Sequence, residues 1–151
     1  MDVTYTLAVA LVILHIACAA AWFGLGLRLT AWGRALAGLS GDARAALADL
    51  GGRTVKLMNV FALLTAVFAF ATLGVGISAG ADYGWPYHAA SALILVLAAV
   101  QYALIAPAWK TLADGASGEA LGRLAAGTGI GHLVWLVILV LMFVQQGGYV
   151  G

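Results

Sequence analysis

The chain alternates between four long apolar stretches and shorter segments that carry most of its charged residues. The stretches are about residues 4–29, 55–79, 87–108 and 124–144, and charged side chains enter them only at their ends, as Arg28 and Lys56 do. An α-helix needs about 20 apolar residues to cross the hydrocarbon core of a bilayer. The pattern therefore predicts four transmembrane helices.

Composition agrees with a membrane protein and leaves little room for anything else. Hydrophobic residues make up 64% of the chain and charged residues 9%, and the mean hydropathy is +1.05, far from the values of soluble domains. Four spans use most of the 151 residues. We therefore expect residues 1–151 to form a single domain, an all-α, up-and-down four-helix bundle in a lipid bilayer.

The basic residues predict the orientation of this bundle. All of them fall on one side if the helices alternate in direction, whereas the other side carries Asp2 and Asp82. They are Arg28, Arg34, Arg44, Arg53, Lys56, Lys110 and Arg123. Because Lys and Arg accumulate in cytoplasmic loops, both termini are expected outside, in the periplasm of a bacterial inner membrane.

The connection between the first two spans contains a second helical pattern. Residues 41–50 are rich in alanine, with Leu47 and Leu50 at helical spacing, and Gly51-Gly52 follows. This pattern predicts a short interfacial helix that the glycine pair separates from the second span.

Two of the three histidines lie deep inside predicted spans. An ionisable side chain at that depth indicates a functional site by default. At the rise of a helix, His15 lies about 16 Å and His132 about 18 Å below the outer ends of their spans. The first and last helices of a simple bundle are neighbours, so the two imidazoles are candidates to ligate one haem iron. The single Cys18 and the absence of a C-x-x-C-H motif favour a b-type haem.

Helical spacing also predicts which residues surround this site. Trp22 lies on the same stripe as His15, and Gly129 and Trp135 share a face with His132. We expect these three residues to line the haem. Ordinary packing of small residues between membrane helices is the alternative for the glycines.

The histidines have other interpretations. His88 lies near the outer interface beside Pro86 and is the alternative iron ligand, a partner of a haem propionate or simply a water-exposed residue. His15 and His132 are also compatible with hydrogen bonds between helices. Their candidate partners are Thr65, Thr72 and Gln101.

The first span resembles a known superfamily. Leu14-His15-Ile16, followed by the Trp-Phe-Gly-Leu-Gly of residues 22–26, is similar to the first helix of copper-resistance protein D-type membrane proteins and of the haem-carrying membrane protoporphyrinogen oxidases. The third span, with Trp85 before a long apolar run that ends in Pro107 and Lys110, resembles small four-helix members of that superfamily. The resemblance implies a four-helix fold in which His15 binds a b-type haem.

The chain departs from the oxidases at three points. Residues 27–30 read Leu-Arg-Leu-Thr where the oxidases have Leu-Pro-Arg, and Trp85 is followed by Pro86, Tyr87 and His88 where they have a lysine. The Asn-Glu-x-Pro near their C-terminus is missing. Haem binding is compatible with these changes, but oxidase activity does not transfer.

Three classes of function follow from the sequence. The leading prediction is a b-type haem membrane protein that transfers electrons, as a partner of quinone or as a small subunit of a membrane redox complex or homo-oligomer. The alternatives are a haem-dependent oxidoreductase acting on a porphyrinogen or quinone, and a cofactor-free structural or assembly subunit. Whether the chain is an enzyme is left open. The spans contain no Asp or Glu, which excludes a buried carboxylate dyad, and a net charge of +1 gives no indication of nucleic-acid binding.

Overall fold

A computed structural model describes residues 3–115 and 118–146, and nearly all of them are helical. Within these ranges, four helices are long and apolar enough to cross a membrane. The first two are α1 (Val3–Gly38) and α2 (Gly41–Ser78). The third is continuous and comprises α3 (Trp85–Val100), η1 (Gln101–Ile105) and α4 (Ala106–Ala113), and the fourth is α5 (Gly118–Gln146). The predicted all-α four-helix membrane bundle is confirmed.

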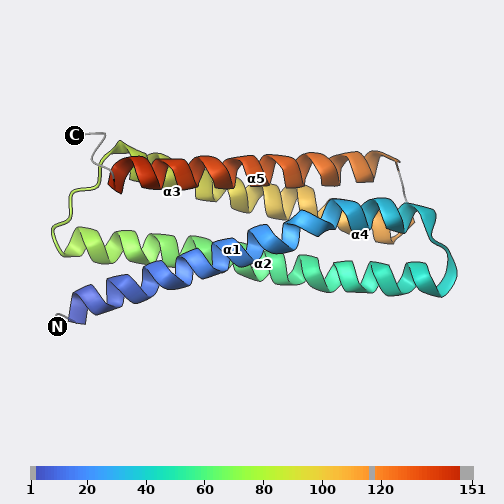
Figure 1. The fold of residues 1–151 in the computed structure, drawn as a ribbon, viewed down its shortest axis with the longest axis horizontal. Coiled ribbons are helices and arrows are strands. Elements are labelled where there is room, and N and C mark those ends of the chain that lie inside the picture. The colour runs from blue at the N-terminus through green and yellow to red at the C-terminus, as the bar shows by residue number, and fades with distance from the viewer. Residues whose placement is uncertain (1–2, 116–117, 147–151) are drawn as a thin grey trace.

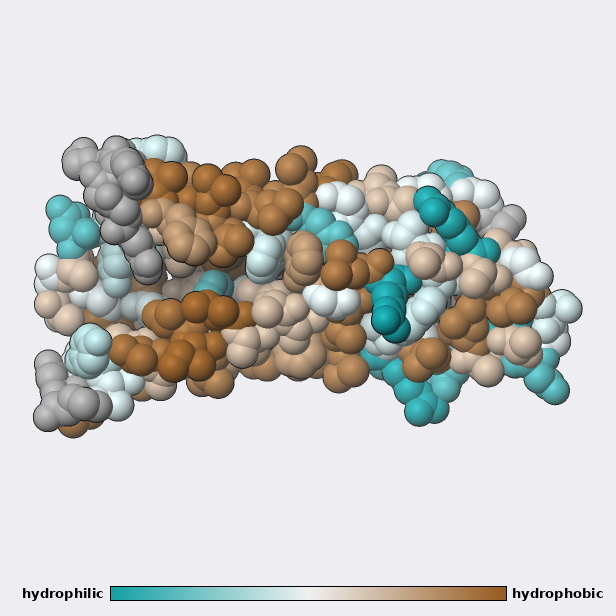
Figure 2. Space-filling model, viewed as in Figure 1, coloured by the Kyte–Doolittle hydropathy of each residue, from teal (hydrophilic) through white to brown (hydrophobic). Residues whose placement is uncertain are grey.

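The four helices alternate in direction along the bundle (Figure 1). α1 packs mainly on α2, α3 packs mainly on α5, and α1 also contacts α5. The connections α1–α2 and α4–α5 lie at one end, which we call the basic end because the basic residues gather toward it. The start of α1, the α2–α3 connection and the end of α5 lie at the opposite end, here called the apolar end. Figure 2 shows teal, hydrophilic residues mainly toward the basic end and brown, hydrophobic ones toward the other.

The predicted break at Gly51-Gly52 is wrong, because α2 continues through both glycines. Gly51 is buried under the indole of Trp109: a Cβ at Gly51 would lie 1.8 Å from Cζ2 of that ring. The indole N–H of Trp109 donates a hydrogen bond to the Ala48 carbonyl at 3.3 Å. The glycine therefore permits close contact between two helices and does not end one.

The third span contains a local distortion that hydropathy does not reveal. Residues Gln101–Ile105 form one π-helical turn, in which the Ala106 N–H bonds to the Gln101 carbonyl. Pro107 follows directly and has no N–H to donate. π-turns within α-helices are frequent at functional sites. Here the turn places the fully buried Gln101 among the neighbouring helices.

Arg44 connects three helices at the basic end. From the first turns of α2, its guanidinium donates hydrogen bonds to the Leu36 carbonyl of α1 and, at 2.7 Å, to the Leu112 carbonyl of α4. The last carbonyls of a helix lack partners within the helix, and a cation there is favourable. This side chain therefore fastens the ends of α1 and α4 to the start of α2.

The half of α1 toward the apolar end is much less buried than the half toward the basic end. The buried residues of α1 extend from Cys18 to Leu36, and those of α2 extend from Gly51 to Thr65. Among the described residues of α1, those before Cys18 are exposed or half-buried. In Figure 1 this part of α1 diverges from α5, and Figure 2 shows the surface hollowed between the two helices there.

Candidate functional site

His15 lies on the inward stripe of α1 and is tied to α2. Its Nδ1 is 2.9 Å from the Thr65 carbonyl oxygen. Because a carbonyl oxygen only accepts, Nδ1 is the donor, and the neutral ring keeps its lone pair on Nε2. A hydrogen bond to Thr65 was among the expected alternatives, but the backbone provides it. The Thr65 hydroxyl is buried and has no hydrogen-bond partner among the described residues.

His132 is packed against α1 in a different way. Its Nε2 is buried and has no hydrogen-bond partner within the described part of the chain. This nitrogen faces Gly26, where an added Cβ would lie 2.9 Å from it. The imidazole also meets the rings of Phe23, with centroids 4.6 Å apart, and Trp22, with centroids 6.0 Å apart at 75°.

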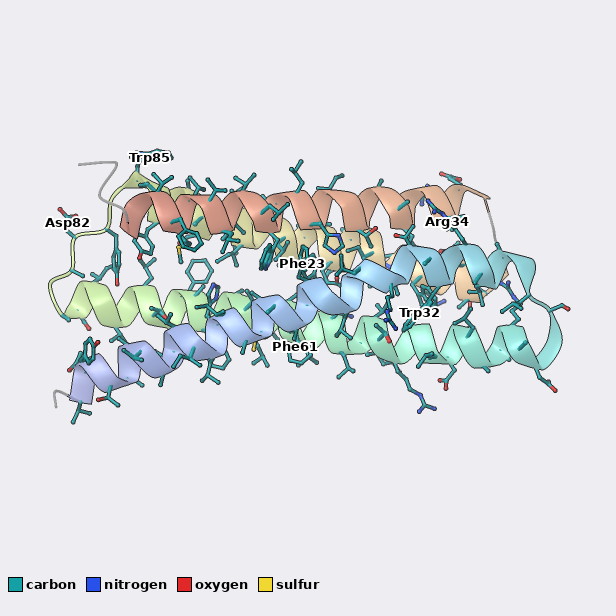
Figure 3. The ribbon with its side chains drawn as sticks, in the orientation of Figure 1. Phe23, Trp32, Arg34, Phe61, Asp82 and Trp85 are labelled. Carbon is teal, nitrogen blue, oxygen red and sulfur yellow. The ribbon has the colours of Figure 1, made fainter. Side chains whose placement is uncertain are left out.

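An aromatic cluster surrounds His132. The rings of Phe23 and Trp135 lie 4.5 Å apart between their centroids, and Figure 3 shows Phe23 between α1 and α5. The Trp22 indole lies over Gly131, where a Cβ would be 2.7 Å from Cη2. The structure therefore brings together three of the predicted site residues, His132, Trp22 and Trp135. It adds Phe23, which the sequence signals only through its position beside Trp22.

The other predicted site residues lie apart from this cluster. Gly129 is exposed, and no described atom lies within 4 Å of where its Cβ would be. His88 is exposed in the first turn of α3, at the apolar end. Neither residue faces His132.

The structure does not bring His15 and His132 to the same level. His15 is bonded to Thr65, whereas the His132 contact, Gly26, lies beside Met58. Thr65 and Met58 are separated by about 10 Å along α2, and His15 and Gly26 by about 16 Å along α1. The prediction that the two histidines lie at one depth is therefore wrong. It counted residues from the ends of the spans, but α1 is tilted and its end is not level with that of α5 (Figure 1).

These positions determine whether the two histidines can ligate the same metal ion. Nitrogen–metal bonds of histidine are about 2 Å long, so two axial nitrogens on one metal lie about 4 Å apart. His15 and His132 are too far apart along the bundle for that, and Nε2 of His132 has the backbone of α1 directly before it. The described residues contain no group of three or more His, Cys, Asp or Glu side chains that could hold a metal ion. A haem shared by the two histidines therefore does not fit this geometry.

A buried polar network next to the cluster was not predicted. The Trp22 indole N–H donates to Gln101 Oε1 at 2.9 Å, and Gln101 Nε2 donates to Asn59 Oδ1 at 2.7 Å. The Tyr102 hydroxyl donates to the Asn59 carbonyl, also at 2.7 Å. The signal in the sequence is the presence of two amide side chains within apolar spans, and Gln101 was considered only as a partner for histidine.

No protein-family model, curated protein or solved structure matches this chain. The likeness of its first helix to haem-carrying membrane proteins therefore depends on His15 and residues 22–26 alone.

Proposed function

We propose that this chain is an integral membrane protein that binds one b-type haem through His15 and serves in electron transfer, alone or as a small subunit of a membrane redox complex. The observation that carries this proposal is the hydrogen bond from His15 Nδ1 to the Thr65 carbonyl. Without such a bond, the ring would lack a fixed tautomer and orientation.

The bond has the form that metal-ligating histidines require. Such a histidine almost always donates its second ring N–H to a carboxylate, a backbone carbonyl or water, and this partner orients the ring and raises its basicity. In His15 the Thr65 carbonyl supplies the partner, which leaves the lone pair of Nε2 for a ligand. A backbone carbonyl keeps this role whichever side chain occupies position 65.

The surroundings of His15 are suited to a flat apolar group. The ring is half-buried on the α1 stripe, in the part of the bundle where α1 moves away from α5. The residues of that stripe next to His15 are Leu11, Ala19 and Trp22. A bound haem would supply one-electron redox chemistry in this apolar environment. His15 is its only proposed protein ligand, because His132 lies at another level and His88 is exposed in the first turn of α3.

A cofactor-free structural subunit is the second candidate, and one observation favours it. His15 already links α1 to α2 through Thr65, and His132 fills the space over Gly26. Hydrogen bonds of this kind between membrane helices contribute roughly 1 kcal/mol. Both histidines then have a role in packing, and the presence or absence of haem distinguishes the two candidates.

The test is a reduced-minus-oxidised absorbance spectrum of protein expressed with haem available and purified in detergent. Wild type should show the Soret and α bands of a b-type haem. His15→Ala should lose them, and His132→Ala and His88→Ala, the matched controls, should keep them. Imidazole added to folded His15→Ala should restore at least part of the haem spectrum, which a purely structural effect of the substitution would not allow.

Two results would contradict the proposal. Wild type without haem would favour the structural subunit. Haem lost equally in His132→Ala and His15→Ala would mean that the two imidazoles act together, against the geometry described above. If haem is bound, turnover of a quinol or porphyrinogen that depends on His15 would make the protein an oxidoreductase.

A further inference from the structure

A groove opens on the outside of the bundle toward the basic end, between the third helix, which consists of α3, η1 and α4, and the first turns of α5. Its volume is about 390 Å³, within the range of small-molecule sites. Side chains of Ala103, Leu104 and Pro107 line its apolar part. Thr111, Glu119 and Arg123 line its polar part.

The groove changes from apolar to polar along the bundle axis. Ala103 and Thr111 are eight residues apart on one continuous helix, which is about 12 Å. The apolar residues lie toward the membrane-spanning part, and the polar ones lie toward the basic end. A ligand that follows the groove therefore needs an apolar tail and a polar head.

The polar part offers two opposite charges side by side. Arg123 Nη2 and Glu119 Oε1 form an ion pair one helical turn apart on α5. Both side chains are largely exposed, at 65% and 81%, so burial does not hold them together. An exposed ion pair of this kind contributes little to stability. A ligand that carries both a negative and a positive group can therefore pair the negative group with Arg123 and the positive group with Glu119.

We propose that this groove binds a phospholipid whose headgroup carries a primary ammonium beside the phosphate, as phosphatidylethanolamine does. The phosphate pairs with Arg123, the ammonium donates to Glu119, and one acyl chain lies along Ala103, Leu104 and Pro107. This site is independent of His15, which lies in the opposite half of the bundle.

The charges select this headgroup over the other common ones. The phosphatidylglycerol headgroup pairs its phosphate with Arg123 but offers the Glu119 carboxylate only neutral hydroxyl groups, which make weaker hydrogen bonds to a carboxylate than an ammonium does. The trimethylated ammonium of phosphatidylcholine has no N–H to donate to Glu119. Of these three headgroups, only that of phosphatidylethanolamine gives Arg123 an anionic partner and Glu119 a cationic hydrogen-bond donor.

The test is native mass spectrometry of the detergent-purified full chain with equal amounts of phosphatidylethanolamine, phosphatidylglycerol and phosphatidylcholine of identical acyl chains. Wild type should retain phosphatidylethanolamine several-fold more than the other two. Arg123→Gln should lower retention of all three, and Glu119→Gln should remove the preference while binding persists. The matched controls are Arg53→Gln and Asp49→Asn, which alter an exposed ion pair of the same spacing on α2 and should retain the wild-type preference.

Three results would overturn the proposal. Equal retention of the three lipids by wild type would show that the groove does not select a headgroup. Preference for phosphatidylglycerol would show that Glu119 plays no part. Surface charge in general, and not this groove, would be responsible if Arg53→Gln lowered retention as much as Arg123→Gln does, or if Asp49→Asn removed the preference as Glu119→Gln does.

Discussion

Glycines in this bundle differ in role from one residue to the next. Gly51 and Gly131 each lie directly beneath a tryptophan ring, whereas Gly129, two residues from Gly131, faces outward with open space around it. Spacing along a helix correctly placed Trp22 and Trp135 on inward faces. It also placed Gly129 on the face of His132, whereas the glycine beneath Trp22 is Gly131, and a glycine has no side chain whose polarity would reveal its face.

Gly51→Ala should destabilise the protein. The new methyl group would overlap the Trp109 ring, whose Cζ2 lies 1.8 Å from its position, and overpacking of this kind costs about 1–3 kcal/mol. The loss exceeds the gain of roughly 1 kcal/mol in helix propensity at most. Thermal unfolding in detergent, followed by circular dichroism, measures the change.

Gly129→Ala is the matched control for this substitution. It has the same gain in helix propensity and no described neighbour within 4 Å. Its melting temperature should equal or exceed that of wild type. A Gly51→Ala variant as stable as Gly129→Ala would show that Trp109 moves aside at no cost.

At the scale of elements, hydropathy located the spans but not the full helices. Each of the four apolar stretches falls, to within one residue, inside one of the four long helices. α1 nevertheless continues to Gly38, and α2 already begins at Gly41. In these parts polar residues replace apolar ones without ending the helix. The π-turn was missed for a similar reason, because hydropathy carries no information about hydrogen-bond register.

Gln101→Leu should destabilise the protein, because Gln101 links η1 to α1 and α2. The substitution leaves the Trp22 indole N–H and Asn59 Oδ1 without their partner. Leaving buried polar groups unpaired costs about 1–3 kcal/mol. A lower melting temperature in detergent and a shifted tryptophan emission spectrum would record the loss.

Ser91→Ala serves as the control for Gln101→Leu. The Ser91 hydroxyl bonds to the Tyr87 carbonyl within the same helix, so its removal breaks no contact between helices. If both variants melt at the wild-type temperature, the network of Gln101 contributes nothing measurable to stability.

At the scale of the molecule, the sequence was right about the number and order of helices and wrong about how they meet. Depths counted from the ends of two spans placed His15 and His132 at one level, but the register between α1 and α5 is set by packing. Thr30 and Thr128 are hydrogen-bonded at 2.8 Å, and Gly33 lies against Leu124. Such contacts depend on side chains of two helices at once, and a single sequence does not show which residues of the two helices meet.

The orientation of the bundle is a prediction for the intact cell. If the basic end is cytoplasmic, a membrane-impermeant thiol reagent should label Asp82→Cys, in the α2–α3 connection, in intact cells. It should label Asp114→Cys, in the α4–α5 connection, only after the cells are opened. Both substitutions are made in a Cys18→Ala background. The reverse pattern would place the basic end outside.

The unequal packing of the two halves has a mechanical consequence for α1. Its contacts with α5 begin around Trp22, and about 28 Å of helix extends from there to Val3. That segment is a stiff lever arm with its pivot at the aromatic cluster. A rotation of only 5° about the pivot displaces the tip by roughly 2.5 Å over this length. At His15, which lies about 10 Å from the pivot and is bonded to Thr65 of α2, the same rotation would change the width of the opening by about 1 Å.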